Sequence, residues 1–584
     1  MKQTRFVLWS GMLLMAALFS LKGSGIAMAQ QSDSAQAAPH SDNNQASPPE
    51  TAGASSREVA ELRALLKAQQ QQIEELRSSI ERQQKLLEGV NNPAAGGAVE
   101  RPNAPVQSPE LRKLGEVAST TPIVPPDPKP APLPASASAS AAQGDSDNVS
   151  PLQLRIGSAY ITPVGFMDFT IVGRSSNTGS GIGSNFGSIP FGNTPTGKLT
   201  DLRFSAQNSR IGLRVDAKVK GAYVLGYLES DFLGFVPPNA AVSSNSDTMR
   251  IRLYWVDVRK DKVEILGGQS WSMLTPNRRG LSAIPADIFY TQNMDTNYQL
   301  GLTWSRNPQF RFIVHPTEAV AWGVSLEEPE QYIGGSGGGG LVTLPTALTT
   351  PYGTQLNNGT TTLSTPAVMP DIISKIAFDP KTASSRAVHF EIAGLVREFR
   401  VYNSLNQNHY SATGAGGSAN LNFELVKNFR VFTNNYMSDG GGRWIFGEAP
   451  DLVIRGDGSI SPLHASSTVD GFEAGFHNSL LSVYYGGAFI GRDTVIDPAN
   501  GKPVGYGYIG SSNGQNRQIH ELTFDWTQTF WKDPKYGSLS LILQYSYVFR
   551  YPWFIATGTP ASAHSNMVFL DLRYTLPGSA PTIQ

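Results

Sequence analysis

The sequence contains no cysteine among its 584 residues. This absence excludes a disulfide scaffold, zinc or iron–sulfur sites built from cysteine, and a cysteine nucleophile. An excess of either charge is also missing, because 46 Lys and Arg residues are balanced by 47 Asp and Glu residues. General nucleic-acid-binding proteins carry a strong basic excess, so the composition argues against a nucleic-acid partner.

Long hydrophobic runs are equally scarce. One mostly apolar stretch, residues 6–19, follows two basic residues and is shorter than the ~20 residues that span a bilayer as a helix. Ala27 and Ala29 then occupy the two small-residue positions that a signal peptidase recognises. We therefore expect residues 1–29 to be a signal peptide cleaved after Ala29, rather than a membrane anchor. The mature chain is then expected to be either soluble outside the inner membrane or an outer-membrane barrel.

Three segments of different composition precede the main domain. Residues 30–56 are rich in Ser, Ala, Gln, Asn and Pro and are predicted to be disordered. Residues 57–90 show core positions at alternating steps of three and four, which predicts a coiled coil; a single amphipathic helix is the alternative. Residues 91–150 form a Pro/Ala/Ser-rich linker. The predicted coiled-coil core comprises Val59, Leu62, Leu66, Gln69, Ile73, Leu76, Ile80, Gln83 and Leu87.

From residue 151 to residue 584 the pattern changes to period two, with many aromatic residues and Gly-rich gaps. For example, Ile251, Leu253 and Trp255 are predicted on one face of a strand, and Arg250 and Arg252 on the other. The chain has few predicted helices that could cover so many apolar faces. A transmembrane antiparallel β-barrel solves this problem, because its apolar side chains face lipid and its charged ones line a wet lumen.

The pattern predicts about 16 strands, joined alternately by short turns and long loops, as in barrels with periplasmic turns and extracellular loops. This count takes 298–315 as a single strand, and two strands there would raise it towards 18. Residues 402–417 are predicted to be a long loop. The predicted strands lie near 160–172, 203–218, 221–232, 249–258, 262–270, 298–315, 319–327, 371–379, 386–401, 418–426, 429–437, 467–476, 480–490, 518–530, 537–550 and 566–576.

Four short segments resemble a Gram-negative outer-membrane porin. Residues 208–213 contain a Ser-Arg-x-Gly strand, and residues 227–232 place Glu near an aromatic at the end of the next strand. Residues 268–272 and 306–311 resemble the segments that flank the third loop of porins. The heptads together with a porin barrel are most similar to DcaP-type trimeric porins.

This resemblance implies that the third long loop, 271–297, folds into the lumen and forms a constriction. The expected constriction residues are Arg278, Arg279, Asp287 and Asp295. An exposed turn with solvated charges is the alternative. The expected pore-lining wall residues are Arg210, Arg214, Arg250, Arg252 and Glu229. Their alternative is internal pairing that only stiffens the wall. Clustered arginines in a pore favour anions.

The expected function is therefore passive uptake of small hydrophilic solutes, favouring small organic anions such as carboxylates. Expected partners are outer-membrane lipid, lipopolysaccharide, two further copies in a homotrimer and, for residues 30–150 in the periplasm, peptidoglycan. The alternative function is a structural tether between the membrane and the periplasm.

We expect no enzyme activity, cofactor or metal site. A barrel enzyme would need a Ser–His pair, and His389 and His520 have no evident partner. Gly337–Gly340 lacks the Gly-Lys-Ser/Thr ending of a phosphate loop. Glu327, Glu328 and Glu330 are expected at a solvated loop mouth, with a divalent cation or lipopolysaccharide as the alternative partner.

Overall fold

The computed structural model describes residues 151–234, 248–359, 366–367, 369–381 and 386–577. The predicted signal peptide, coiled coil and linker, with Ala27, Ala29 and the heptad core, lie outside these residues.

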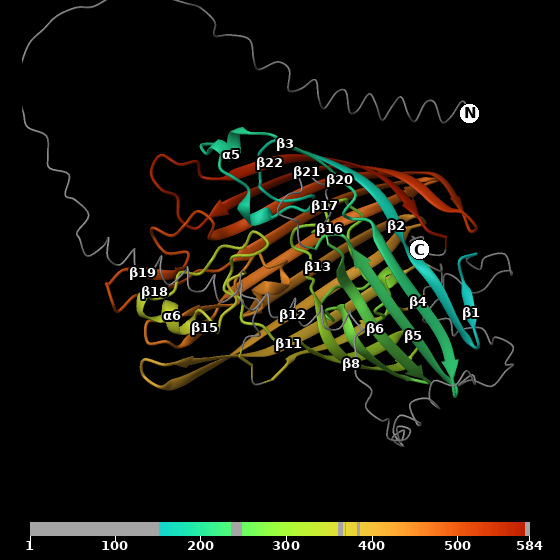
Figure 1. Cartoon of the computed structure of the whole chain (residues 1–584), viewed down its shortest axis with the longest axis horizontal. Coiled ribbons are helices and arrows are strands. Elements are labelled where there is room, and N and C mark those ends of the chain that lie inside the picture. Colours follow the sequence, from blue (N-terminus) through green and yellow to red (C-terminus); the bar gives the residue numbers. More distant parts are fainter. Residues whose placement is uncertain (1–150, 235–247, 360–365, 368, 382–385, 578–584) are drawn as a thin grey trace, which may run out of the picture. The chain divides into compact units, whose positions relative to one another are not determined.

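A single antiparallel sheet of 18 strands forms the main domain, and it closes on itself where β2 pairs with β22 (Figure 1). β3 and β4 pair with successive parts of β2 and form one wall strand, while β1 pairs only with the start of β2. The wall is therefore a closed barrel of 16 strands, which confirms the predicted fold class. The sheet strands are β1 (Leu154–Ile156), β2 (Ala159–Arg174), β3 (Asp201–Ser205), β4 (Arg210–Val219), β5 (Ala222–Asp231), β6 (Arg250–Lys260), β7 (Val263–Trp271), β8 (Arg306–Thr317), β9 (Val320–Glu327), β10 (Asp371–Phe378), β11 (Val388–Asn403), β12 (Asn408–Val426), β13 (Phe429–Asp439), β16 (His464–Phe476), β17 (Ser479–Ile490), β20 (Asn516–Asp533), β21 (Gly537–Pro552) and β22 (Ala563–Thr575).

The wall strands alternate between the outer surface and the interior with the predicted period of two. On β10, Ile376 and Phe378 are exposed, whereas Asp371 and Lys375 are buried inside the barrel. A water-soluble barrel would bury the apolar face instead. An apolar outer surface around a charged interior is the arrangement of barrels that span membranes.

On β6 the predicted alternation is wrong after Arg252. Ser230 pairs with Ile251 and Glu229 with Leu253, so Arg252 is the extra residue of a β-bulge. The side chains of Arg252 and Leu253 are 1% and 0% exposed, whereas Tyr254 is 63% exposed. Because the bulge shifts the phase by one residue, Leu253 faces the interior rather than sharing the outer face of Ile251.

The prediction of one strand over 298–315 is also wrong in its first half. β8 begins at Arg306, and residues 298–305 belong to the preceding loop. Tyr298 and Gly301 have positive φ values of 63° and 85°, which a strand does not accommodate. Leu300 and Leu302, whose spacing suggested a lipid-facing strand, are buried inside the barrel.

The predicted long loop at 402–417 is not a loop. β11 and β12 continue through it and are joined by residues 404–407 alone. The Gly- and Ser-rich composition of 411–419 suggested a loop, but these small residues pair in register with β11 and β13. Pairing along both neighbours has overridden the weak strand propensity of these residues.

The remaining long loops carry short elements of their own. These are η2 (Phe186–Ser188), α5 (Pro195–Lys198), η3 (Pro285–Asp287), η4 (Thr346–Leu348), α6 (Thr349–Tyr352), η5 (Gly442–Trp444), β14 (Leu452–Ile454), β15 (Ile460–Pro462), β18 (Asp493–Ile496) and β19 (Pro503–Tyr506). Within the part of the chain that the structure describes, no helix is long and apolar enough to cross a membrane.

Several long loops fold into the barrel and form a buried apolar cluster with its inner wall. Phe186, Leu274, Tyr352 and Trp444, from four different loops, are all fully buried in this cluster. The Gly-rich segment lies where these loops meet. A Cβ atom on Gly339 would lie 2.1 Å from the carbonyl oxygen of Gly447, so only glycine allows this approach.

Candidate pore constriction

The third long loop, residues 272–305, crosses the lumen from β7 and β8 to the opposite wall. Near its start, the Met273 N–H donates to Glu327 on β9 at 2.8 Å. Further along, the Met294 N–H donates to Gln544 on β21, and the Leu300 N–H donates to Glu521 on β20 at 2.8 Å. The loop therefore rests on inward-facing polar side chains on both sides of the barrel.

Arg278 anchors this loop to the far wall through a buried ion pair. Its guanidinium donates to both carboxylate oxygens of Glu473 on β16, at 2.8 and 2.7 Å. The same group lies 4.8 Å from the ring centre of Phe289. Burial lowers the pKa of Arg278, but the Glu473 carboxylate raises it by more, so the pair is fully charged. A bidentate pair of this kind fixes the position of the loop.

Arg279 and Asp287 lie on the side of the loop that faces the short turns. They line a cavity with Arg214, Asp257, Glu264 and His315 from the wall strands. The Asp287 carboxylate is partly shielded from water, and this burial raises its pKa to about 6, against the opposing effects of Ser282 and Arg279. Asp287 is therefore a group that titrates near neutral pH.

Asp295 is buried and joins the third loop to the first. Its carboxylate accepts hydrogen bonds from the Ser184 N–H at 3.0 and 3.1 Å and from the Asn297 N–H at 2.9 Å. Burial raises the pKa of Asp295. Its side chain consequently holds two loops together and presents no exposed charge to the lumen.

The predicted wall residues gather around Glu229 on β5. Arg252 donates to Glu229 and to Asp231, both at 2.7 Å, and to the Tyr298 hydroxyl at 3.0 Å. Arg250 donates to Asp231 at 2.7 and 3.1 Å and keeps 38% of its side chain exposed. Arg252 shares the inward phase of Arg250, and the β6 bulge changes the facing of the residues that follow it.

The two remaining predicted arginines occupy different places. Arg210 lies 3.7 Å from Glu229, at the edge of the same group. Arg214 pairs with Asp216 at 2.7 Å and lines the cavity described above. The structure thus brings Arg210, Arg250, Arg252 and Glu229 together and leaves Arg214 apart from them.

The sequence reasoning missed an aromatic group beside this wall. Arg306 lies over the rings of Trp271 and Trp304, at 5.2 and 4.9 Å from their centres. Tyr290 and Tyr298 complete the group, with ring centres 6.3 and 5.6 Å from that of Trp271. Trp271 and Arg306 are opposite each other on β7 and β8. Trp271 and Arg306 lie in the two segments that flank the predicted third loop, and this placement is the sequence feature from which the aromatic group could have been predicted.

Tyr298 connects the aromatic group to the arginines. Burial raises the pKa of Tyr298, but the charges of Arg252, Arg210 and Arg306 outweigh this effect and lower it to about 8. The lowered pKa of Tyr298 is caused by the positive charge that surrounds its hydroxyl in the lumen.

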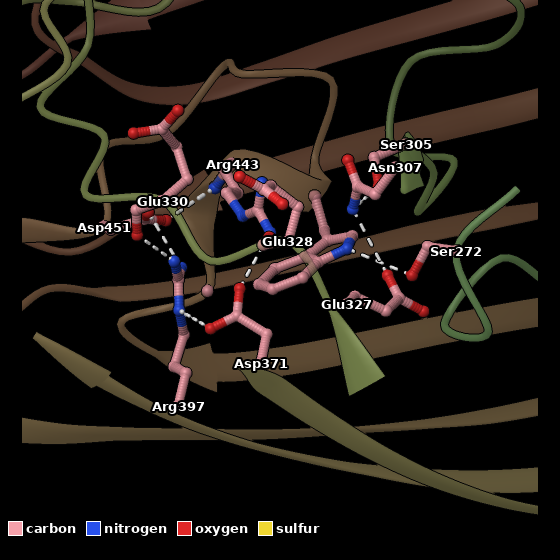
Figure 2. A network of polar contacts seen from close by, with 12 residues as sticks. Ser272, Ser305, Asn307, Glu327, Glu328, Glu330, Asp371, Arg397, Arg443 and Asp451 are labelled. Carbon is pink, nitrogen blue, oxygen red and sulfur yellow. Dashed lines mark hydrogen bonds and ion pairs between the residues drawn. The ribbon is translucent and has the colours of Figure 1, made fainter. Parts of the chain in front are cut away.

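A second network, also absent from the prediction, attaches the loop between β13 and β16, residues 440–463, to the wall (Figure 2). Arg397 on β11 pairs with Asp371 at 3.2 Å and with Asp451 at 2.8 Å. Arg443 of the loop pairs with the same Asp371 at 2.7 Å. The neighbouring Trp444 donates its indole N–H to Ser272 of the third loop at 3.2 Å, so the two loops hold each other.

The histidines considered for catalysis are bonded to other groups. His389 lies between Asp379 and Glu391, at 2.9 and 3.1 Å, and His520 contacts the Tyr485 hydroxyl at 2.8 Å. Among the described residues there is no group of His, Cys, Asp or Glu side chains arranged to hold a metal ion.

Known proteins are similar to this chain in structure. The outer membrane channel DcaP of Acinetobacter baumannii is 17% identical, and the match covers 73% of this chain and all of that one with a TM-score of 0.52. The anion-selective porin of Comamonas acidovorans is 11% identical over 71% of this chain and 99% of that one, with a TM-score of 0.39. Salmonella typhi OmpF is 8% identical over 72% of this chain and 99% of that one, again at 0.39.

No family model matches the chain, and neither does any curated protein sequence. The similarity to DcaP shows that the chain has the fold of this outer-membrane channel.

Proposed function

We propose that this barrel is an outer-membrane diffusion channel for small hydrophilic solutes, with a preference for small organic anions such as carboxylates. The observation that carries the proposal is the closed wall of 16 strands with an apolar outside and a charged inside. Such a wall is stable in lipid, and its polar interior is suited to aqueous solutes. The shared fold with DcaP supports the same function.

The preference for anions rests on the charges beside the third loop. Arg210, Arg250, Arg252 and Arg306 form one side of the lumen, with Glu229 and Asp231 as their neighbouring carboxylates. These four guanidinium groups and two carboxylates leave two positive charges, which attract anions into a narrow passage. Arg279 adds a guanidinium on the loop beside Asp287, whereas the charge of Arg278 is neutralised by Glu473.

A liposome swelling assay tests this function. Liposomes that contain the purified protein should swell faster in sodium lactate than in lysine hydrochloride of equal osmolarity, and they should also admit arabinose. Equal rates for the anion and the cation would contradict the preference. Swelling no faster than that of protein-free liposomes would contradict the channel itself.

The proposal extends to assembly and location. We infer that the barrel is a homotrimer in the outer membrane, in contact with lipid and lipopolysaccharide, and that residues 30–150 lie in the periplasm, where peptidoglycan is a candidate contact. The predicted coiled coil of residues 57–90 would need partner helices, which supports an oligomer. Light scattering of the detergent-solubilised protein should give a mass of three chains, and a single-chain mass would contradict the trimer.

The alternative function remains a structural tether between the membrane and the periplasm, in which residues 30–150 would make the attachment. Deletion of this segment separates the two functions. A channel without it should still conduct, whereas a tether without it would lose its effect on attachment of the membrane to the cell wall.

A further inference from the structure

Arg306 differs from Arg210, Arg250 and Arg252, its neighbours in the lumen, because it has no carboxylate partner in the described part of the chain. The carboxylates of Glu229 and Asp231, which lie within electrostatic range of it, are bonded to Arg252 and Arg250. Arg306 itself forms no ion pair within the described residues, and its Nη1 atom is buried without a hydrogen-bond partner. A buried guanidinium N–H that lacks an acceptor is costly, because it has lost its hydrogen bonds to water without replacing them.

The two indoles that enclose this guanidinium lack acceptors as well. Trp271 and Trp304 are 1% and 8% exposed, and the Nε1–H of each has no acceptor in the described structure. Their ring centres are 5.8 Å apart, and both rings are in contact with Arg306. Indole nitrogen is a donor only, so neither Trp can satisfy the other or the arginine.

Trp255 on β6 also has a buried indole N–H without an acceptor among the described residues, but other tryptophans of the barrel are paired. Trp553 also lies beside an arginine, with Arg492 5.6 Å from its ring centre, but its indole N–H donates to the Ile490 carbonyl at 3.1 Å. Trp444 and Trp322 similarly donate to Ser272 and Ser374. Since most buried donors in proteins have a partner, three unpaired donors on touching side chains indicate a missing acceptor.

We propose that Arg306, Trp271 and Trp304 form a binding site for the carboxylate group of a small organic acid in the lumen. A carboxylate has two oxygens and up to four acceptor positions, which suit two indole N–H groups and a guanidinium N–H. Arg250, which is partly exposed, adds positive charge at its edge. The site rests on the proposed function, because a channel for organic anions brings this ligand to it.

The indoles hold the guanidinium in place for this role. A guanidinium in contact with two aromatic rings, here inclined at 61° to each other, is restricted in orientation and only weakly hydrated, so its N–H edge stays available to a planar carboxylate. Chloride would be attracted by the charge of Arg306. It is spherical, however, and has no directional acceptor positions to match the three N–H donors. The site therefore predicts a channel that saturates with carboxylates at lower concentration than with chloride.

The test uses the full chain and acetate as the probe, with two independent readouts. Saturation-transfer NMR on the protein in detergent measures acetate binding, and single-channel conductance in potassium acetate measures saturation of transport. For Arg306→Gln, we expect the acetate Kd and the half-saturating concentration to rise about tenfold. For Trp304→Phe, which keeps the ring and removes the donor, we expect a rise of about threefold. The matched controls Arg492→Gln and Trp553→Phe should leave both unchanged.

The outcomes separate this site from the proposed function. Conductance without acetate binding in the wild type would overturn the site and keep the channel. Binding without conductance would keep the site and overturn the channel. If Trp304→Phe folds and binds acetate as the wild type does, or if inorganic phosphate binds this site in preference to acetate, the carboxylate assignment is wrong.

Discussion

At the scale of single residues, the ion pair between Arg278 and Glu473 holds the third loop across the lumen. Both groups are buried, and the pair is bidentate. Replacement of Arg278 by Gln leaves the buried Glu473 carboxylate with the Tyr484 hydroxyl, at 3.1 Å, and the more distant Arg430, at 3.8 Å, but without its bidentate partner. Loss of one partner from a buried pair costs about 3–5 kcal/mol, so the loop should detach.

We therefore expect Arg278→Gln to show larger and noisier single-channel currents than the wild type. The matched control is Lys381→Gln, which removes an exposed pair with Glu318 and should leave the currents unchanged. Currents of wild-type size and noise in Arg278→Gln would mean that other contacts suffice to hold the loop.

Asp287 gives the lumen a dependence on pH. Burial raises its pKa from 3.8 to about 6, so the folded protein binds a proton at a pH where the unfolded chain does not. The contribution of Asp287 to the free energy of unfolding therefore increases as the pH falls through 6 towards 4. This contribution is lost as the pH rises through 6.

Protonation of Asp287 also removes a negative charge from the cavity that it lines with Arg279 and Arg214. Between pH 7.5 and pH 5, the anion-to-cation permeability ratio should rise in the wild type, and Asp287→Asn should show the higher ratio at both values. Reversal potentials at the two pH values measure this. Asp457→Asn, in an exposed loop, is the control. Retention of the full pH effect in Asp287→Asn would assign it to another group.

At the scale of elements, the strand pattern was predictable because lipid-facing barrels impose one period on every strand. Alternation located all sixteen wall strands, and the apolar face proved to be the outer one. The errors arose where the conformation of a strand depends on contacts with neighbouring strands, which the sequence does not show. The β6 bulge is a register shift in the pairing of β6 with β5, which no local pattern reveals.

The candidate site was less predictable than the wall, for a similar reason. Arg250 and Arg252 were predicted from their phase, and Glu229 lies in a segment that resembles porins. Trp304 was assigned to a lipid-facing strand because its spacing in 298–315 matches one. An apolar residue at alternate positions looks the same whether it faces lipid or a loop-filled lumen, so sequence spacing could not distinguish the two.

The Gly-rich segment makes a prediction for the packing of the loops. Gly339→Ala would place a Cβ 2.1 Å from the Gly447 carbonyl oxygen, whereas a Cβ on Gly181 has no neighbour within 4 Å. Overpacking of this kind costs about 1–3 kcal/mol. Urea unfolding of the purified protein should show this loss for Gly339→Ala and little change for Gly181→Ala. Equal stability of the two variants would show that the loops can part to admit a methyl group.

At the scale of the whole molecule, the closed wall and the inward-folded loops have separate roles. The wall satisfies its backbone hydrogen bonds by closure and places apolar side chains outside, which suits it to lipid. The third loop and the loop of residues 440–463, held by Glu473, Asp371 and Ser272, fold into the barrel, and under the proposed function they would narrow the passage and set its charge. Deletion of the loops should therefore change selectivity while the barrel itself still folds.

The zero-current potential of the wild-type protein, measured in a planar bilayer under a tenfold gradient of potassium chloride, decides whether the barrel is an anion-preferring channel. We expect stepwise conductance and a reversal potential whose sign shows that chloride is more permeant than potassium. A reversal potential of the opposite sign would contradict the role of the arginine side of the lumen, and absence of conductance from the folded barrel would contradict the channel.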